Sequence, residues 1–274
     1  MSAISILETF LNGDLPFPVA ADEGAFCKIW HDQGLGEAPA VSSALRGGLI
    51  ADRLPWVFVA GYQAAIRHFF PDVPASGWAA YAATEDKADP VAHPPATLSA
   101  DGKLHGCKSW VAQSRHVDHL LVTVGEQCVL IDAKQSGVQL SHRESPGFLG
   151  AMSQGFARFD AVTPERTYDQ ERMREFGRRE PRYVMLAGVG YLLGQLKDAD
   201  DALQRGLIGL ALGLAAVCET ADVAHKTLAS LDRGLQSAID RFQVAVDCTA
   251  LPQWDSDRRL LSMYSARIRE RATR

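Results

Sequence analysis

The sequence lacks most of the features that mark a nucleic-acid-binding or membrane protein. Its 274 residues carry 28 Lys and Arg against 33 Asp and Glu, and the formal net charge of -5 provides no basic field for nucleic acid. No apolar run reaches about 18 residues, which disfavours a membrane span. The N-terminus lacks the basic start and apolar core of a secretory signal. We therefore expect a cytoplasmic protein that binds neither nucleic acid nor membrane.

Cysteines and histidines are too dispersed to predict a metal site. The cysteines form no C-x-x-C pair, so neither a zinc site nor a disulfide framework is indicated, and reduced, buried thiols are expected. The histidines of the central region do not share a metal-ligand spacing with a carboxylate or thiol, which favours surface or hydrogen-bonded histidines. The residues concerned are Cys27, Cys107, Cys128, Cys218, Cys248, His105, His116, His119 and His142.

Apolar periodicity predicts helices at the start of the chain. Hydrophobic residues make up 47% of the sequence, enough for a sizeable core. They recur at three- and four-residue spacing in residues 4–11 and 23–32, which is typical of helices. A longer helical pattern over residues 40–70 contains Pro55, which lacks a backbone donor and should break the helix. We expect two helices that meet near Leu54.

The middle of the chain has the alternation and turn residues of a small antiparallel β domain. Asp101 and Gly102 form a typical hairpin turn, and further reversals are expected at residues 125–126 and 135–137. After Pro164 the pattern becomes helical again, over residues 184–196, 202–231, 235–246 and 255–271, with Asp255 placed to cap the last helix. The predicted division is helices over residues 1–76, a β domain over 77–165 and helices over 166–274.

Two motif blocks carry a resemblance to a known family. The first contains Tyr81, Thr84 and Glu85, then Thr97 and Ala100, an Asp-Gly turn, a Gly-x-Lys-x-Trp strand ending at Trp110, and finally Asp118, Leu121 and Val122. The second runs from Gln154 to Pro164 as Gln-Gly-x-x-x-Phe-Asp-x-Val-x-Pro. Together with Arg182 and the small residues that follow it, these blocks resemble the acyl-CoA dehydrogenase flavoproteins. The resemblance implies an α+β fold with N-terminal helices, a central antiparallel β-barrel-like domain and a C-terminal helical bundle.

The same resemblance implies an FAD cofactor held against the β domain. The implied cofactor-binding residues are Tyr81, Ala83, Thr84, Glu85, Trp110, Val111 and Ala112, with Arg205 supplied by a neighbouring subunit. Trp110 could instead be a core aromatic residue. The chain departs from the family at residues 86–90, where the family has a Gly-Ser-Asp turn, and after Trp110, where the family has Ile-Thr-Asn or Ile-Ser-Asn. The first departure weakens the case for flavin binding because only glycine allows a close backbone approach without steric cost. The second removes the side-chain hydroxyl that the resemblance implies near flavin N5.

The catalytic base is the weakest part of the resemblance. The family's Tyr-Glu-Gly-Thr motif near the C-terminus is missing, and Glu180, close to the position used by a minority of members, is the remaining candidate. A carboxylate before Pro181 is more often an exposed residue at a helix start, favoured by the helix dipole. The sequence thus leaves two functions open. One is FAD-dependent oxidation of the CH–CH bond of acyl-CoA or another acyl thioester in fatty acid metabolism. The other is a catalytically silent homologue that partners an active subunit.

The apolar residues of the segment 202–231 lie on more than one face of the expected helix, which a monomer of this size could not easily cover. We therefore expect a homo-oligomer, or a hetero-oligomer with a related subunit.

Overall fold

The computed structural model describes residues 1–143, 147–196 and 201–273. Helices come first, strands follow and helices end the chain, which confirms the predicted order and the α+β class. Contacts group these residues into two compact units. The helical unit consists of Met1–Ala21, Lys28–Ala65 and Arg179–Arg274, and the β unit of Asp22–Cys27 and Ile66–Arg178. The helical unit thus draws on both ends of the chain.

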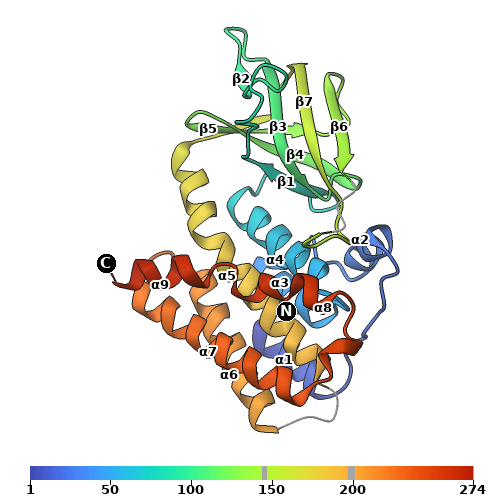
Figure 1. The fold of residues 1–274 in the computed structure, drawn as a ribbon, viewed down its shortest axis with the longest axis vertical. Coiled ribbons are helices and arrows are strands. Elements are labelled where there is room, and N and C mark those ends of the chain that lie inside the picture. Colours follow the sequence, from blue (N-terminus) through green and yellow to red (C-terminus); the bar gives the residue numbers. More distant parts are fainter. Residues whose placement is uncertain (144–146, 197–200, 274) are drawn as a thin grey trace. The chain divides into compact units, whose positions relative to one another are not determined.

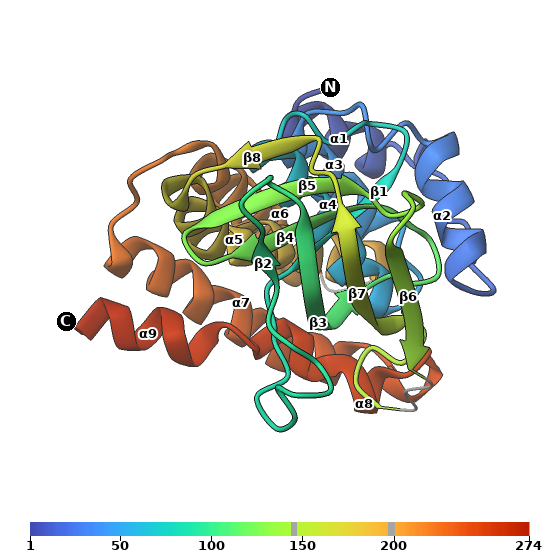
Figure 2. The same cartoon turned by 90° about the horizontal axis from the view of Figure 1, so that it is seen from above.

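The β unit contains two four-stranded sheets (Figure 2). In the first the strand order is β1 (Trp78–Ala82), β4 (Val117–Val124), β5 (Gln127–Asp132) and β8 (Arg166–Tyr168). In the second it is β2 (Thr97–Leu98), β3 (Leu104–Ala112), β7 (Gln154–Val162) and β6 (Val138–Arg143). The hydrophobic core of this unit includes Leu104, Val111, Leu120, Val129 and Phe159.

Three details of the predicted β domain are wrong. The strands form two separate sheets and not a closed barrel, and β1 pairs with β4 in parallel. A parallel pair needs a crossover connection, and here β2 and β3 lie between the two strands in the chain and pair in the other sheet. Strand β8 also lies beyond Pro164, where only helices were expected. The predicted turns are correct, with Gly102 (φ 77°) and Gly125 (φ 57°) in the left-handed region that glycine adopts at low cost.

The N-terminal helices closely match the sequence pattern. They are α1 (Ala3–Leu11), α2 (Glu23–Asp32), α3 (Ala40–Leu49) and α4 (Leu54–Phe69). Pro55 lies in the first turn of α4, where a missing backbone donor has no cost, so the predicted break near Leu54 is confirmed. Helix α3 lies close to α5: a Cβ atom on Gly48 would sit 2.0 Å from the carbonyl oxygen of Ala187. Only glycine fits at that crossing.

The C-terminal helices differ more from expectation. They are α5 (Gln170–Gln195), α6 (Asp201–Glu219), α7 (His225–Ala245), α8 (Trp254–Asp257) and α9 (Ser265–Thr273). The single helix predicted over 202–231 is interrupted after Glu219. Two arginines of α5 end α6 by donating to its last carbonyl oxygens: Arg179 to Cys218 at 2.7 Å, and Arg182 to Val217 at 2.7 Å. Such donors satisfy carbonyl groups that a helix end leaves without a partner.

The last predicted helix, over 255–271, is also divided. A short 3-10 stretch, Arg258–Ser262, separates α8 from α9. Asp255 lies inside α8, and the residue that precedes this helix is Gln253, whose φ of 57° is left-handed. Asp255 is therefore not the cap that the sequence indicated.

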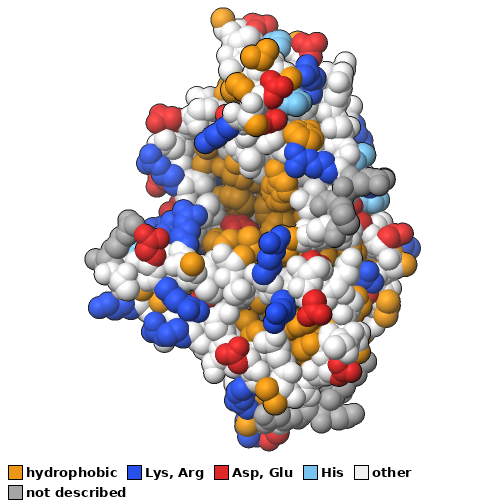
Figure 3. All heavy atoms as spheres, in the orientation of Figure 1, with side chains coloured by type: hydrophobic (Ala, Val, Ile, Leu, Met, Phe, Trp, Pro, Cys, Tyr) orange, Lys and Arg blue, Asp and Glu red, His pale blue; other side chains and the backbone are white. Residues whose placement is uncertain are grey.

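The surface carries mixed charge, and one helix, α6, is strongly apolar. On the face shown in Figure 3, Lys and Arg side chains are interspersed with Asp and Glu side chains. Among the described residues, α6 alone has the length and apolar composition of a membrane-crossing helix. One such helix is weak evidence for a membrane span, and 39% of its apolar stretch is buried within the described residues.

Candidate active-site elements

Trp110 lies on β3 where the pairing of this strand with β7 is irregular. The register shifts between Lys108 and Val111, and Trp110 falls inside that irregularity. Its side chain is partly exposed, whereas those of Trp30, Trp56 and Trp78 are fully buried. Its indole Nε1 donates to Gln154 Oε1 at 3.0 Å, and Gln154 Nε2 donates to the carbonyl oxygen of Phe148 at 3.1 Å. The indole is thus held in a fixed orientation with part of its surface accessible.

The segment after β1 is attached to β3 beside this tryptophan. The carbonyl oxygen of Thr84 accepts from the backbone N–H of Ser109 at 2.8 Å and from its hydroxyl at 3.2 Å. Lys108 Nζ donates to Glu85 Oε1 at 2.9 Å, and Lys108 is only 1% exposed. A buried ammonium group requires such a partner. Glu85 therefore anchors the segment to β3, which sequence reasoning did not assign to it.

The other residues predicted around the cofactor have different surroundings. Tyr81 is half-buried in an aromatic cluster, and the centroid of its ring lies 4.6 Å from that of Phe176. Burial raises the pKa of its hydroxyl. Ala83 and Thr84 are exposed. Val111 and Ala112 are fully buried, so their side chains belong to the core and only their backbone could serve a ligand.

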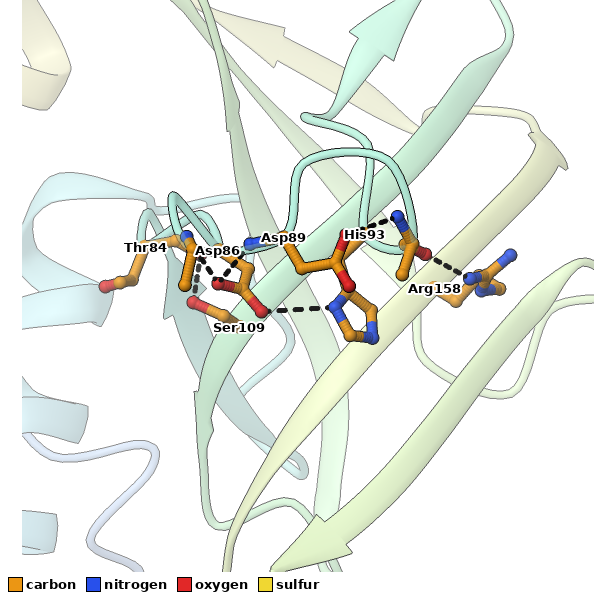
Figure 4. A network of polar contacts seen from close by, with 8 residues as sticks. Thr84, Asp86, Asp89, His93, Ser109 and Arg158 are labelled. Carbon is orange, nitrogen blue, oxygen red and sulfur yellow. Dashed lines mark hydrogen bonds and ion pairs between the residues drawn. The ribbon is translucent and has the colours of Figure 1, made fainter.

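The loop of residues 86–93 is ordered by its own side chains (Figure 4). Asp86 Oδ1 accepts from the backbone N–H of Ala88 at 3.0 Å, and Asp86 Oδ2 lies 3.1 Å from His93 Nδ1. Asp89 Oδ1 accepts from the backbone N–H of Ala92 at 2.9 Å. The bond from Ala88 is the main reason that the pKa of Asp86 is lowered. The backbone donors of Ala88 and Ala92 are thus used inside the loop.

In the helical unit, Glu180 and Tyr264 form a hydrogen-bonded pair. Glu180 lies on α5, and Tyr264, which immediately precedes α9, donates from Oη to Glu180 Oε1 at 2.7 Å. Burial raises the pKa of Glu180 to about 7, and the bond from Tyr264 partly opposes that rise. A carboxyl group that titrates near neutral pH can hold or release a proton under physiological conditions.

The position of Tyr264 is fixed by its neighbours in α9. The carboxylate of Asp232, on α7 and 1% exposed, accepts from the hydroxyl of Ser265, the residue after Tyr264. It also accepts from Arg269 Nε at 2.9 Å. Sequence reasoning missed Tyr264 as a partner of Glu180, because no spacing rule connects residues 84 positions apart.

Arg205 lies on the exposed side of α6 and forms an ion pair with Asp201, one helical turn earlier. Such exposed pairs contribute little to stability. Its predicted contact with a cofactor of a neighbouring subunit remains a prediction. Across the described ranges, no three His, Cys, Asp or Glu side chains are grouped so that they could hold a metal ion.

Comparisons with known proteins give the fold a context. No protein-family model matches the sequence, and no curated protein matches it. Among solved structures, one described as an FAD-dependent dehydrogenase aligns with a TM-score of 0.64 at 14% identity, over 98% of this chain and 96% of that chain. The prolyl acyl carrier protein oxidase AnaB aligns with a TM-score of 0.60 at 12% identity, over 99% and 96%. FkbI, from the biosynthesis of a methoxymalonyl extender unit, aligns with a TM-score of 0.60 at 13% identity, over 100% and 98%. At these identities the likeness shows a shared fold.

Proposed function

We propose that this protein is a flavin-dependent oxidoreductase of the acyl-CoA dehydrogenase type, with FAD as cofactor and an acyl thioester as substrate. The observation that carries the proposal is Glu180, a carboxyl group in the helical unit whose pKa is about 7 and whose oxygen accepts a hydrogen bond from Tyr264. The motif resemblance and the fold shared with FAD-dependent dehydrogenase and oxidase structures support it.

The residues of the β unit fit the planar ring of a flavin. The partly exposed indole of Trp110 is fixed by Gln154, and an aromatic surface of this kind suits stacking against a flat ligand. The exposed Thr84 lies on the adjoining segment and adds a hydroxyl donor. The flavin, when bound, would accept a hydride from the substrate. The loop of residues 86–93 fits a phosphate poorly, since its N–H groups at Ala88 and Ala92 already have acceptors.

Glu180 is the proposed proton acceptor. Oxidation of the CH–CH bond of an acyl thioester removes a proton from the α carbon and a hydride from the β carbon. Above pH 7 Glu180 is mostly ionised and can take the α proton on a carboxylate oxygen, while Tyr264 stabilises the ionised form through its hydrogen bond. Arg182 holds the end of α6 and acts on structure, without a part in the proton transfer.

The second candidate function is a catalytically silent homologue that partners an active subunit. The self-satisfied loop of residues 86–93 favours it, because the loop offers few donors to a cofactor or thioester. The two candidates differ in a measurable way: a silent homologue would not reduce a flavin with any acyl thioester.

Glu180→Gln tests the proposal directly. General-base catalysis contributes a factor of about 100 to 10,000, so we expect FAD-loaded E180Q to be reduced by acyl-CoA or by an acyl carrier protein thioester at least about 100 times more slowly than the wild type. The matched control is Glu175→Gln, an equal charge change on the same helix but in the β unit, where Glu175 pairs with Arg178. Equal rates in E180Q and the wild type would remove Glu180 as the base. No reduction of the wild type by any thioester would favour the silent homologue.

A further inference from the structure

A cavity of about 470 Å³ in the β unit contains an ionisable cluster that the proposed oxidation does not use. Its lining includes Glu23 at the start of α2, Arg115 and His116 from the β3–β4 connection, Arg143 at the end of β6, and Ser153 just before β7. Charged groups from three separate parts of the chain therefore converge on one space.

One of the two arginines has its guanidinium oriented before any ligand arrives, and the other has its backbone held. The guanidinium of Arg143 lies 3.9 Å from the centroid of the Phe156 ring, a cation–π contact that fixes its plane. The backbone N–H of Arg115 donates to Ser153 Oγ at 2.9 Å, which ties its loop to the opposite wall. A guanidinium held like that of Arg143 binds a tetrahedral anion with little loss of side-chain freedom, and the exposed side chain of Arg115 can reach the same space from its fixed loop.

The loops that carry these residues adopt backbone conformations that non-glycine residues rarely take. Gln113 has φ of 57° two residues before Arg115, and Leu149 has φ of 55° in the segment that leads to Ser153. Backbone conformations of this type cost free energy and cluster at binding sites. Gln154, the residue after Ser153, is the same side chain that fixes Trp110.

The acidic groups do not cancel the positive charge. Asp22 caps α2, with Oδ1 accepting from the backbone N–H of Ala25 at 2.8 Å. Glu23 is 5% exposed, and its Oε1 accepts from the backbone N–H of Ser153 at 3.1 Å. Burial raises the pKa of Glu23 to about 7, so below that pH it is mostly neutral.

His142 is a neighbour of this cavity whose pKa responds to burial and to the nearby positive charges. Its Nδ1 lies 3.0 Å from Ser114 Oγ, and its pKa is lowered by desolvation and then by the positive charges of Arg115 and His116. A bound anion would offset those charges.

We propose that this cavity binds a dianionic phosphate group, free or as an ester, between Arg115 and Arg143. The site is separate from the proposed oxidation and does not depend on a flavin. Neutral Glu23 would donate a hydrogen bond to the anion, and ionised Glu23 would repel it. The groups that face Glu23 are Asp22 and Cys27 on its own segment, and Arg115, His116 and Ser153 from the opposite wall.

Calorimetric titration with sodium sulfate and with inorganic phosphate tests the proposal. Sulfate keeps its charge across the pH range and so separates protein ionisation from ligand ionisation. Hydrogen bonds to charged groups contribute enough that Arg115→Gln and Arg143→Gln should each weaken sulfate binding about tenfold or more. Arg174→Gln, the same change at an exposed position of α5 outside the lining, should leave binding unchanged. Thermal unfolding of each variant checks that it is folded.

Glu23→Gln provides a second, opposite test. Wild-type affinity for sulfate should fall as pH rises through about 7, where Glu23 ionises. E23Q remains neutral and should bind sulfate several-fold more tightly than the wild type at about pH 8. Sulfate should also raise the pKa of His142 in NMR titrations.

Adenosine 5′-monophosphate, compared with inorganic phosphate and with adenosine, identifies the source of the anion. Tighter binding of the monophosphate than of phosphate indicates an ester, and the reverse indicates the free anion. The proposal is overturned if the wild type binds neither sulfate nor phosphate, if both arginine variants bind like the wild type, or if adenosine binds as well as its monophosphate. None of these results bears on flavin reduction, so failure here is distinct from failure of the proposed oxidation.

Discussion

Replacing Tyr264 by phenylalanine removes one hydroxyl group from a buried contact and tests the chemistry assigned to Glu180. Tyr264 Oη donates to Glu180 Oε1 at 2.7 Å and partly opposes the effect of burial, and the resulting pKa of Glu180 is about 7. A hydrogen bond to a charged group contributes about 1.5 to 3 kcal/mol, and one pKa unit corresponds to about 1.4 kcal/mol. The hydroxyl of Tyr264 also bonds the protonated carboxyl, but more weakly, so only part of this energy shifts the pKa. We therefore expect the pKa of Glu180 to rise by about 1 to 2 in Tyr264→Phe.

The same change predicts a pH-dependent loss of stability. The pKa of Glu180 in the folded protein is above its ordinary value of 4.5, so the favourable contribution of the protonated group is complete below about pH 4.5 and is lost as pH rises through 7. In Tyr264→Phe this loss of stability continues to higher pH, because the pKa of Glu180 in the folded variant is higher. Between about pH 5 and about pH 9, the free energy of unfolding of the variant should therefore fall by about 1 to 3 kcal/mol more than that of the wild type.

Carbon-13 NMR of glutamate-labelled protein measures this pKa directly, and Glu180→Gln identifies its signal. Urea unfolding at the two pH values measures the stability difference. The control is Tyr191→Phe. Tyr191 is a buried tyrosine on α5, the helix that carries Glu180, and its electrostatic neighbours do not include Glu180. If Glu180 titrates at the same pH in Tyr264→Phe and the wild type, the hydrogen bond does not control its ionisation and the assignment fails.

The buried Lys108 and the partly exposed Glu85 should respond unequally to substitution. Glu85→Ala leaves an ammonium group buried without its carboxylate and should cost about 3 kcal/mol of unfolding free energy, whereas Lys108→Met should cost less. Equal costs in chemical unfolding would contradict this account of the pair. Gly48→Ala places a methyl group against the carbonyl of Ala187 and should destabilise the protein by about 1 to 3 kcal/mol or prevent folding. Gly206→Ala, on an open side of α6, should instead stabilise it by about 0.5 to 1 kcal/mol, and a loss of stability there would argue that this face is covered.

Local sequence signals were sufficient for much of the fold. Periodicity located α1 and α2, Pro55 marked the start of α4, and the Asp-Gly pair at 101–102 marked a turn. Each of these depends on residues that are neighbours in the chain. The end of α6 could not be found in this way, because it depends on Arg179 and Arg182 of another helix. The parallel pairing of β1 with β4 is likewise a long-range choice that alternation does not encode.

The candidate site was predictable to a similar degree. The motif pointed to Trp110 and Thr84, which the structure places on adjoining segments of the β unit. It assigned Glu85 to the cofactor, whereas the Glu85 side chain contacts Lys108. Glu180 was indicated only by its place in the chain. Its raised pKa and its partner Tyr264 depend on burial and on a contact across the helical unit, which sequence patterns do not report.

The absorbance spectrum of the purified protein, before and after FAD is added, tests the central claim most directly. We expect a yellow protein, or a colourless one that takes up one FAD per chain on titration, with the bound flavin released as FAD on denaturation. Trp110→Ala should lower that occupancy while the β unit remains folded, because the indole is partly exposed and lies outside the buried core. A protein that carries no flavin and takes up no FAD would contradict the claim that it is a flavin-dependent oxidoreductase.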